Sequence, residues 1–89
     1  MAAPPLQLVD VLLFASAADA FGADRVRIAV PGGATAAQLQ AALIAAAREA
    51  TGRELPPACR LAVNQRFAPP ELPVGPDDEI ALIPPVAGG

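Results

Sequence analysis

Few side chains in this sequence could do chemistry. The 89 residues contain no His, no Lys and a single Cys, Cys59, and their nine acidic residues are scattered or fall in predicted turns. Catalysis near neutral pH usually needs a group that titrates there, most often His. Ser-His-Asp and Cys-His catalytic sites, and zinc sites built from Cys and His, are therefore excluded. We expect any reactive group to belong to the backbone rather than to a side chain.

The carboxyl end of the sequence is the candidate for that group. The last seven residues, from Ile83 to Gly89, read IPPVAGG. Two prolines favour an extended exit from a strand, and glycines without a Cβ can pass through a narrow channel. A terminus without a role is the competing interpretation. The order of strand, Pro-Pro and Gly-Gly favours a working tail at 84–89, with the α-carboxylate of Gly89 as the reactive group.

Three other motifs have simpler explanations than catalysis or binding. Cys59 begins an apolar strand, where a small buried hydrophobic residue is expected, and Arg60 should point to the opposite face. Residues 31–33 (Pro-Gly-Gly) lack the Lys and the spacing of a phosphate-binding loop and predict a turn. Residues 77–79 (Asp-Asp-Glu) predict a hairpin turn rather than a cation site.

Composition limits the class of protein. The chain is 54% hydrophobic and 17% charged, which predicts one small folded domain. A net charge of −3 without a basic patch argues against nucleic acid and anionic membranes as partners. The uncharged stretch 28–47 is interrupted by Pro-Gly-Gly and contains two Gln, so it reads as strand, loop and helix rather than a membrane span. A lone Cys and the lack of a signal-peptide pattern predict a soluble, cytoplasmic protein.

The apolar periodicity predicts the elements that must position the tail. Strands are expected at 6–14, 25–30, 59–64 and 79–83, a short helix at 15–21, and a long helix from a Thr35–Gln38 capping box to about Ala50. The first and last strands are the most apolar, so we place them together, parallel, at the sheet centre. The long helix crosses one face. This order predicts an α+β β-grasp arrangement, a mixed sheet with one main helix.

Several stretches, taken together and in order, resemble the small sulfur-carrier subunit of molybdopterin synthase. They are VLLFA (11–15), Gly22, AVNQ (62–65), GPDDEIALIPP (75–85) and the final VAGG. The resemblance covers 9–89 and leaves 1–8 as an N-terminal extension. It implies a ubiquitin-like β-grasp domain at 9–83 and an extended tail at 84–89.

The resemblance also implies a reaction. A ubiquitin-activating-type adenylating enzyme would use ATP to adenylate Gly89, and a sulfur donor protein would supply the sulfur that replaces AMP to give a thiocarboxylate. The large synthase subunit, in a heterotetramer, would then pass the sulfur to cyclic pyranopterin monophosphate, forming the dithiolene of the molybdenum cofactor. The carrier would be non-catalytic, with the catalytic residues on the large subunit and no cofactor bound permanently.

The resemblance assigns an interface as well. Bulky apolar residues at the positions of Phe14, Phe67 and Ile83 face the large subunit in that family, and the large subunit binds the tail. The implied partner-binding residues are therefore Phe14, Phe67, Ile83, Pro85, Val86, Ala87 and Gly88. One departure concerns Ala18-Asp19, which stands where the family usually has Arg-Glu, so an ion pair made by that arginine is absent here.

Two classes of alternative remain open. A sulfur carrier for thiazole (thiamine) or cysteine biosynthesis would use the same tail chemistry, although thiazole carriers typically have a smaller insert where this chain has 36–58. A ubiquitin-like binding module without tail chemistry would not depend on Gly88 and Gly89. A covalent protein modifier is also conceivable, and without Lys it could not conjugate to itself through side-chain amines.

Overall fold

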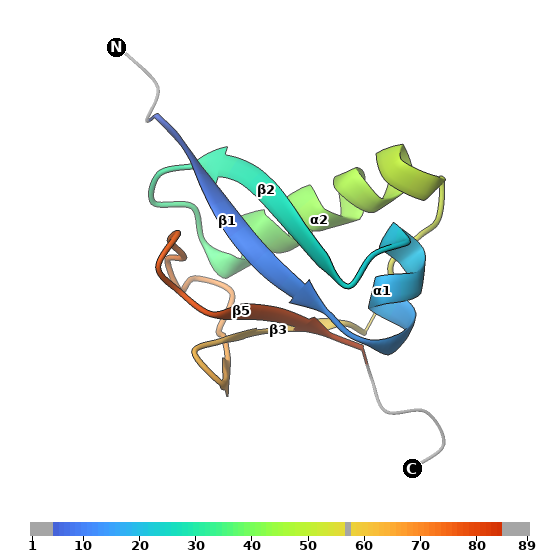
Figure 1. Ribbon diagram of the computed structural model, residues 1–89. Coiled ribbons are helices and arrows are strands. Elements are labelled where there is room, and N and C mark those ends of the chain that lie inside the picture. Colours follow the sequence, from blue (N-terminus) through green and yellow to red (C-terminus); the bar gives the residue numbers. More distant parts are fainter. Residues whose placement is uncertain (1–4, 57, 85–89) are drawn as a thin grey trace.

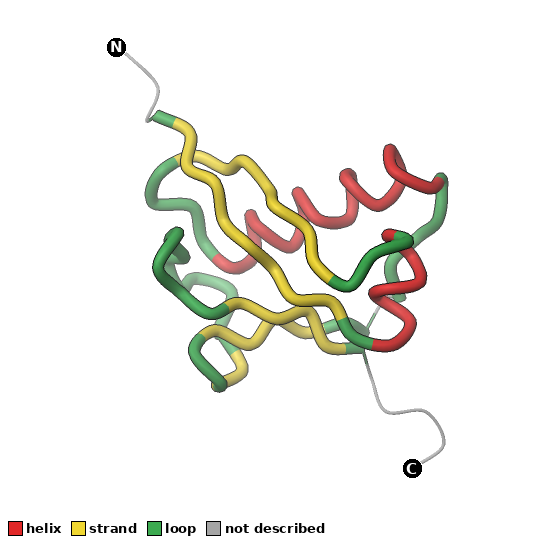
Figure 2. The backbone as a smooth tube through the Cα atoms, in the orientation of Figure 1, coloured by secondary structure: helices red, strands yellow, loops and turns green. Residues whose placement is uncertain are grey.

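Two layers make up the part of the chain that the structure, a computed structural model, describes: residues 5–56 and 58–84. Residues 1–4, 57 and 85–89 lie outside the described residues. One layer is a twisted sheet and the other is a long helix lying across it (Figures 1 and 2). In chain order the elements are β1 (Leu6–Leu13), α1 (Ala15–Phe21), β2 (Arg25–Pro31), α2 (Ala36–Thr51), β3 (Arg60–Val63), β4 (Arg66–Phe67) and β5 (Ile80–Ile83).

The sheet has the strand order β2-β1-β5-β3-β4. β1 and β5 pair in parallel, with Val11 opposite Ile80, whereas the other neighbouring strands are antiparallel. The first and last strands are thus adjacent and parallel, as predicted. The predicted β-grasp arrangement, a mixed sheet with one main helix across one face, is confirmed.

Local signals explain where α2 begins and ends. The Thr35 hydroxyl accepts a hydrogen bond from the Gln38 backbone N–H (3.3 Å), and the Gln38 side chain accepts one from the Thr35 backbone N–H (2.9 Å). This capping box satisfies two N–H groups that the first turn leaves unpaired. The helix ends at Gly52, whose φ of 76° is the left-handed conformation that glycine adopts without strain.

The core lies between α2 and one face of the sheet. Leu39 and Leu43 of α2 are fully buried, as are Val9 and Val11 of β1 and Leu82 of β5. Burying a side chain of this size contributes about 1.5–3 kcal/mol. The core cluster contains no polar or charged residue among the described residues, so its stability rests on packing.

One strand was not anticipated. β4 follows β3 through a two-residue turn in which Asn64 (φ 54°) and Gln65 (φ 70°) both adopt left-handed backbone conformations. Two consecutive positive φ angles give a type I′ turn, whose twist suits a tight hairpin. Asn is favoured at the first of these positions, but the second usually carries Gly. With Gln65 there, the sequence lacks the signal that identifies such hairpins.

Candidate functional site

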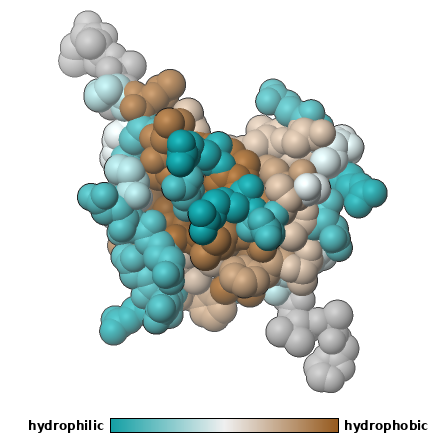
Figure 3. All heavy atoms as spheres, viewed as in Figure 1, coloured by the Kyte–Doolittle hydropathy of each residue, from teal (hydrophilic) through white to brown (hydrophobic). Residues whose placement is uncertain are grey.

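No helix of the described residues covers the face of the sheet opposite α2 (Figure 1). Side chains alternate along a strand, so the β1 residues that lie between the buried core residues point to this open face. Leu8 is 55% exposed there, whereas Val9 beside it is fully buried. Figure 3 shows this face, on which hydrophobic side chains lie along β1 with hydrophilic side chains among them. An apolar surface of this kind is uncommon without a partner.

The strand register brings a row of apolar residues together on the open face. Leu12 lies opposite Ala81, Ala81 opposite Ala62, and Ala62 opposite Phe67. Phe14 continues β1 in an extended conformation (φ −123°, ψ 146°), and its side chain is 49% exposed. We call the set of open-face apolar residues near the end of β5 the open-face patch: Leu12, Phe14, Ala62, Phe67, Ala81 and Ile83.

The three residues that the sequence singled out for an interface all lie in this patch. Phe67, on the short edge strand β4, is 52% exposed. Ile83, the last residue of β5, is partly buried. The two small residues Ala62 and Ala81 lie in the row between Leu12 and Phe67, which leaves the larger side chains standing at its edges. Their role in binding stays a prediction, but their placement on one surface is a property of the fold.

The candidate reactive residue lies outside the described residues. Gly89, with Gly88, Ala87, Val86 and Pro85, belongs to the undescribed segment. The structure does describe the point from which this segment departs. Pro84 is buried, and Ile83 directly before it belongs to the open-face patch. Any partner that covers the patch therefore also meets the base of the segment that carries Gly89.

Charged residues surround the patch. The Arg60 guanidinium stacks over the Phe67 ring, 3.8 Å from the ring centroid. Arg27 Nε donates to Asp10 Oδ1 at 2.9 Å on the same face, and this hydrogen bond together with the charge of Asp10 raises the pKa of Arg27. Arg25 is opposite Leu12 and lines, with Asp24 and Phe14, a cavity of about 350 Å³.

Cys59 is placed as predicted. It is 6% exposed, and burial raises the pKa of its thiol. Arg60 next to it is exposed on the open face, so it does not activate the thiol. A buried thiol with a raised pKa is a poor nucleophile. The structure gives Cys59 a packing role.

Turns are present at both predicted places, 31–33 and the segment before β5. The second is not the predicted hairpin turn, because the strands on either side of it, β4 and β5, do not pair with each other. In the turn before β5, Asp78 Oδ2 accepts the Gly75 N–H at 2.8 Å and Asp78 Oδ1 accepts the Asn64 side-chain amide at 3.0 Å. The Asp78 carboxylate is thus used in loop hydrogen bonds, and no metal-binding cluster occurs among the described residues. In the loop before α2, the Ala34 N–H donates to the Pro31 carbonyl at 3.0 Å.

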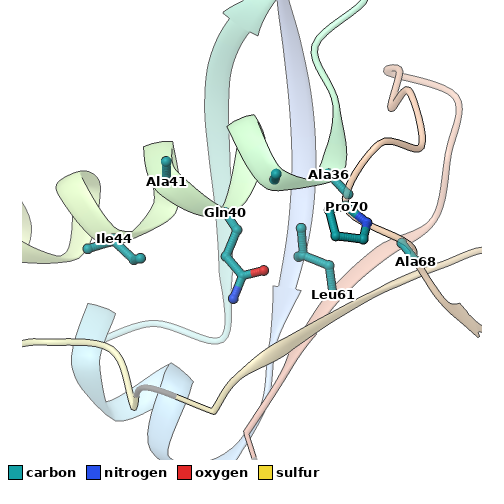
Figure 4. Close-up of a pocket in the computed structure, with 8 residues that line it drawn as sticks. Ala36, Gln40, Ala41, Ile44, Leu61, Ala68 and Pro70 are labelled. Carbon is teal, nitrogen blue, oxygen red and sulfur yellow. The ribbon is translucent and has the colours of Figure 1, made fainter.

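A second hollow lies on the other side of the molecule, between α2 and the segment after β4. It has a volume of about 300 Å³, and Ala36, Gln40, Ile44, Leu61 and Pro70 are among the residues that line it (Figure 4). Gln40 Nε2 donates to the Cys59 carbonyl at 2.8 Å, so its amide helps hold the loop. The residues lining this hollow include no charged group, and the arrangement offers no catalytic chemistry.

The comparison of the sequence with known protein families decides the class. The sequence profile of the ThiS family matches residues 11–89, which include both the open-face patch and the final glycines. The chain belongs to the ThiS family. The resemblance to ubiquitin-like sulfur carriers that the sequence motifs indicated is therefore confirmed at the level of the family.

Solved structures agree with the ThiS assignment. SAMP1 (small archaeal modifier protein 1) from Haloferax volcanii is 33% identical, with 92% of this chain and 99% of that chain covered and a TM-score of 0.72. A candidate molybdopterin converting factor, subunit 1, from Pyrococcus furiosus is 21% identical, covering 90% and 99%, with a TM-score of 0.73. Subunit 1 in a complex with subunit 2 of the Helicobacter pylori molybdopterin-converting factor is 22% identical, covering 93% and 100%, with a TM-score of 0.54. The last two likenesses establish the ubiquitin-like fold alone.

Within this ThiS chain, α1 carries the departure noted in the sequence. Ala18 is partly buried and packs against the core, whereas Asp19 is exposed. A guanidinium at the position of Ala18 is therefore absent, whereas Arg60 on β3 places one over the Phe67 ring of the patch. The sequence indicated only that Arg60 points away from Cys59. Its position over Phe67 depends on β4, which sequence reasoning missed. No helix among the described residues is long and apolar enough to cross a membrane.

Proposed function

We propose that this ThiS-family chain is the sulfur-carrier subunit of molybdopterin synthase. The observation that carries the proposal is the open-face patch at the base of a segment ending in Gly88-Gly89, in a chain of this family. The complex of subunits 1 and 2 from Helicobacter pylori supports a large-subunit partner for the patch. The patch contains two exposed aromatic residues, Phe14 and Phe67, and aromatic residues are enriched at protein interfaces.

In the proposed cycle, the Gly89 carboxylate attacks the α-phosphate of ATP on an adenylating enzyme and pyrophosphate leaves. Sulfide-level sulfur from a sulfur donor protein then attacks the acyl carbon, and AMP leaves as the bond between the acyl carbon and the phosphate oxygen breaks. The product is a thiocarboxylate, which is the sulfur nucleophile for cyclic pyranopterin monophosphate on the large subunit. Water then cleaves the acyl–sulfur bond, which leaves the sulfur on the pterin and returns the Gly89 carboxylate. The carrier needs no acid or base of its own, which suits a chain without His. It binds no cofactor permanently, and ATP belongs to the adenylating enzyme.

The fold's part in this cycle is to fix the base of the tail. β5 lies at the centre of the sheet and Pro84 is buried, so the tail starts from a rigid point. Five residues beyond Pro84 span at most about 18 Å when fully extended. Docking of the patch therefore determines which part of the partner Gly89 can reach.

A second candidate, a covalent protein modifier, is favoured by the 33% identity to SAMP1. It would share the adenylation step. The acyl carbon would then be attacked by an amine of another protein instead of by sulfur, with AMP as the leaving group. The two functions differ in the product, so the mass of the product distinguishes them.

The test uses the full chain, ATP, a sulfur donor and the adenylating enzyme of the source organism. Intact-protein mass spectrometry should show one oxygen-to-sulfur exchange at the carboxyl terminus, and addition of the large subunit and pterin should return the original mass. Deletion of Gly89, or extension by one residue, should lower pterin conversion at least about a hundredfold, because a displacement of about 1 Å can have that effect. Circular dichroism should show all variants folded. If the deletion variant converts pterin as well as the wild type, the assignment of Gly89 is wrong.

A further inference from the structure

One cation lies within the apolar part of the open face. Arg60 begins β3 and lies opposite Ile83, and its guanidinium covers the Phe67 ring on the other side. It is thus flanked by two of the bulky residues of the open-face patch. No carboxylate of the described residues lies within ion-pair distance of Arg60, whereas Arg27 and Arg48 each have an acidic partner.

The stacking on Phe67 orients this guanidinium. A guanidinium that lies over an aromatic face is held in place by cation–π attraction, and its N–H donors project around the edge of its plane. That arrangement suits bidentate recognition of a carboxylate. The side chain therefore loses less conformational freedom on binding an acidic group than an unrestrained arginine would.

Covering the patch would change the environment of this charge. A partner surface on Phe67 and Ile83 removes water from Arg60, and a buried charge without a partner is strongly unfavourable. Arg25 is in a different position, because it lies on the edge strand β2 with Asp24 beside it in the same cavity. The positive charge that needs an acidic group on the partner is therefore that of Arg60.

We propose that Arg60 is a specificity-determining residue of the open face, which pairs with a carboxylate side chain on the large synthase subunit when the patch is covered. This inference rests on the proposed function, because that function supplies the partner. It places the cationic contact on β3 beside Phe67, far along the chain from Ala18 on α1, the position at which the family that the chain resembles usually has an arginine.

Binding of the full chain to the recombinant large subunit of molybdopterin synthase from the same organism tests the inference. Dissociation constants should be measured by calorimetry for the wild type, Arg60→Leu and Arg60→Glu. Arg66→Leu is the matched control, because Arg66 is an exposed arginine on neighbouring β4, and its pairing with Val63 assigns it to the other face. Thermal unfolding checks that each variant is folded.

We expect Arg60→Leu to weaken binding at least tenfold, Arg60→Glu to weaken it further, and Arg66→Leu to change it less than twofold. Arg60→Leu removes the charge but keeps an apolar side chain next to Phe67, so its loss of affinity measures the missing ion pair rather than missing packing. Wild-type affinity in Arg60→Leu overturns the inference and leaves the proposed function standing. A wild-type chain that does not bind the large subunit overturns the proposed function and the inference together.

Discussion

Asn64 links the β3–β4 hairpin to the loop that precedes β5. Its replacement by Ala should lower the free energy of unfolding more than substitutions of exposed residues usually do. The Asn64 side chain accepts the Glu79 N–H at 2.9 Å and donates to Asp78 at 3.0 Å. Its backbone N–H also donates to the Glu79 carbonyl at 2.7 Å, and its φ is 54°. One residue thus holds a strained turn and joins two segments far apart in the sequence.

The expected loss follows from these two contributions. Two hydrogen bonds at about 0.5–1.5 kcal/mol each give roughly 1–2 kcal/mol, because both lie at the surface. The left-handed conformation adds about 1 kcal/mol when Ala replaces Asn. Asn64→Ala should therefore lower the free energy of unfolding by about 2–3 kcal/mol, out of roughly 4–13 kcal/mol expected for a domain of this size. The midpoint of thermal unfolding should fall by about 4–8 °C for each kcal/mol.

Urea denaturation of Asn64→Ala and Asn64→Gly separates the contributions. Gly adopts positive φ without strain, so Asn64→Gly should lose the hydrogen bonds and yet recover about 0.5–1 kcal/mol of the loss in Asn64→Ala. Asn64→Ala should also weaken binding of the large subunit, because the hairpin carries Phe67. An unfolding free energy of Asn64→Ala within about 0.5 kcal/mol of wild type would refute the reasoning. So would equal losses in both variants.

Two further predictions concern single side chains. Cys59→Ala should leave thiocarboxylate formation intact, because the thiol is buried with a raised pKa; a folded variant that fails to acquire sulfur in the mass assay would contradict this. The hydrogen bond from Arg48 lowers the pKa of Glu54, so this exposed pair stabilises the fold above the ordinary pKa of Glu and stops doing so as the pH falls through the lowered value. Glu54→Gln should therefore lower the thermal midpoint slightly near pH 7 and leave it unchanged near pH 2, and equal shifts at both pH values would exclude the pair as the cause.

The sequence predicts most of the fold because its strongest signals are local. The Thr35–Gln38 capping box, the glycines that end α1 and α2, and the alternation in β2 each identify an element within a few residues of its observed bounds. β4 escapes prediction because it has two residues and its turn lacks glycine. Such a strand depends on pairing with β3, a contact that propensity does not encode.

The candidate site is predicted less completely for a different reason. β1 is apolar on both faces, so its pattern does not say which face α2 covers; only the assembled sheet shows Val9 inside and Leu8 outside. The same holds for Arg60, whose contact with Phe67 requires the hairpin. The predicted interface residues Phe14, Phe67 and Ile83 came from the family resemblance, and the proposed role of Gly89 rests on chemistry rather than on described geometry.

The parallel pairing of β1 with β5 also has a consequence for the order of events during synthesis. Val11 and Ile80 are far apart in the sequence, yet they are paired on neighbouring strands in the middle of the sheet. Closing so long a loop is entropically costly, and topologies dominated by such contacts fold slowly. A nascent chain on the ribosome has no partner for the inner edge of β1 until β5 has emerged. The segment that carries Gly89 follows directly after β5. The strand that completes the sheet is therefore synthesised immediately before this segment.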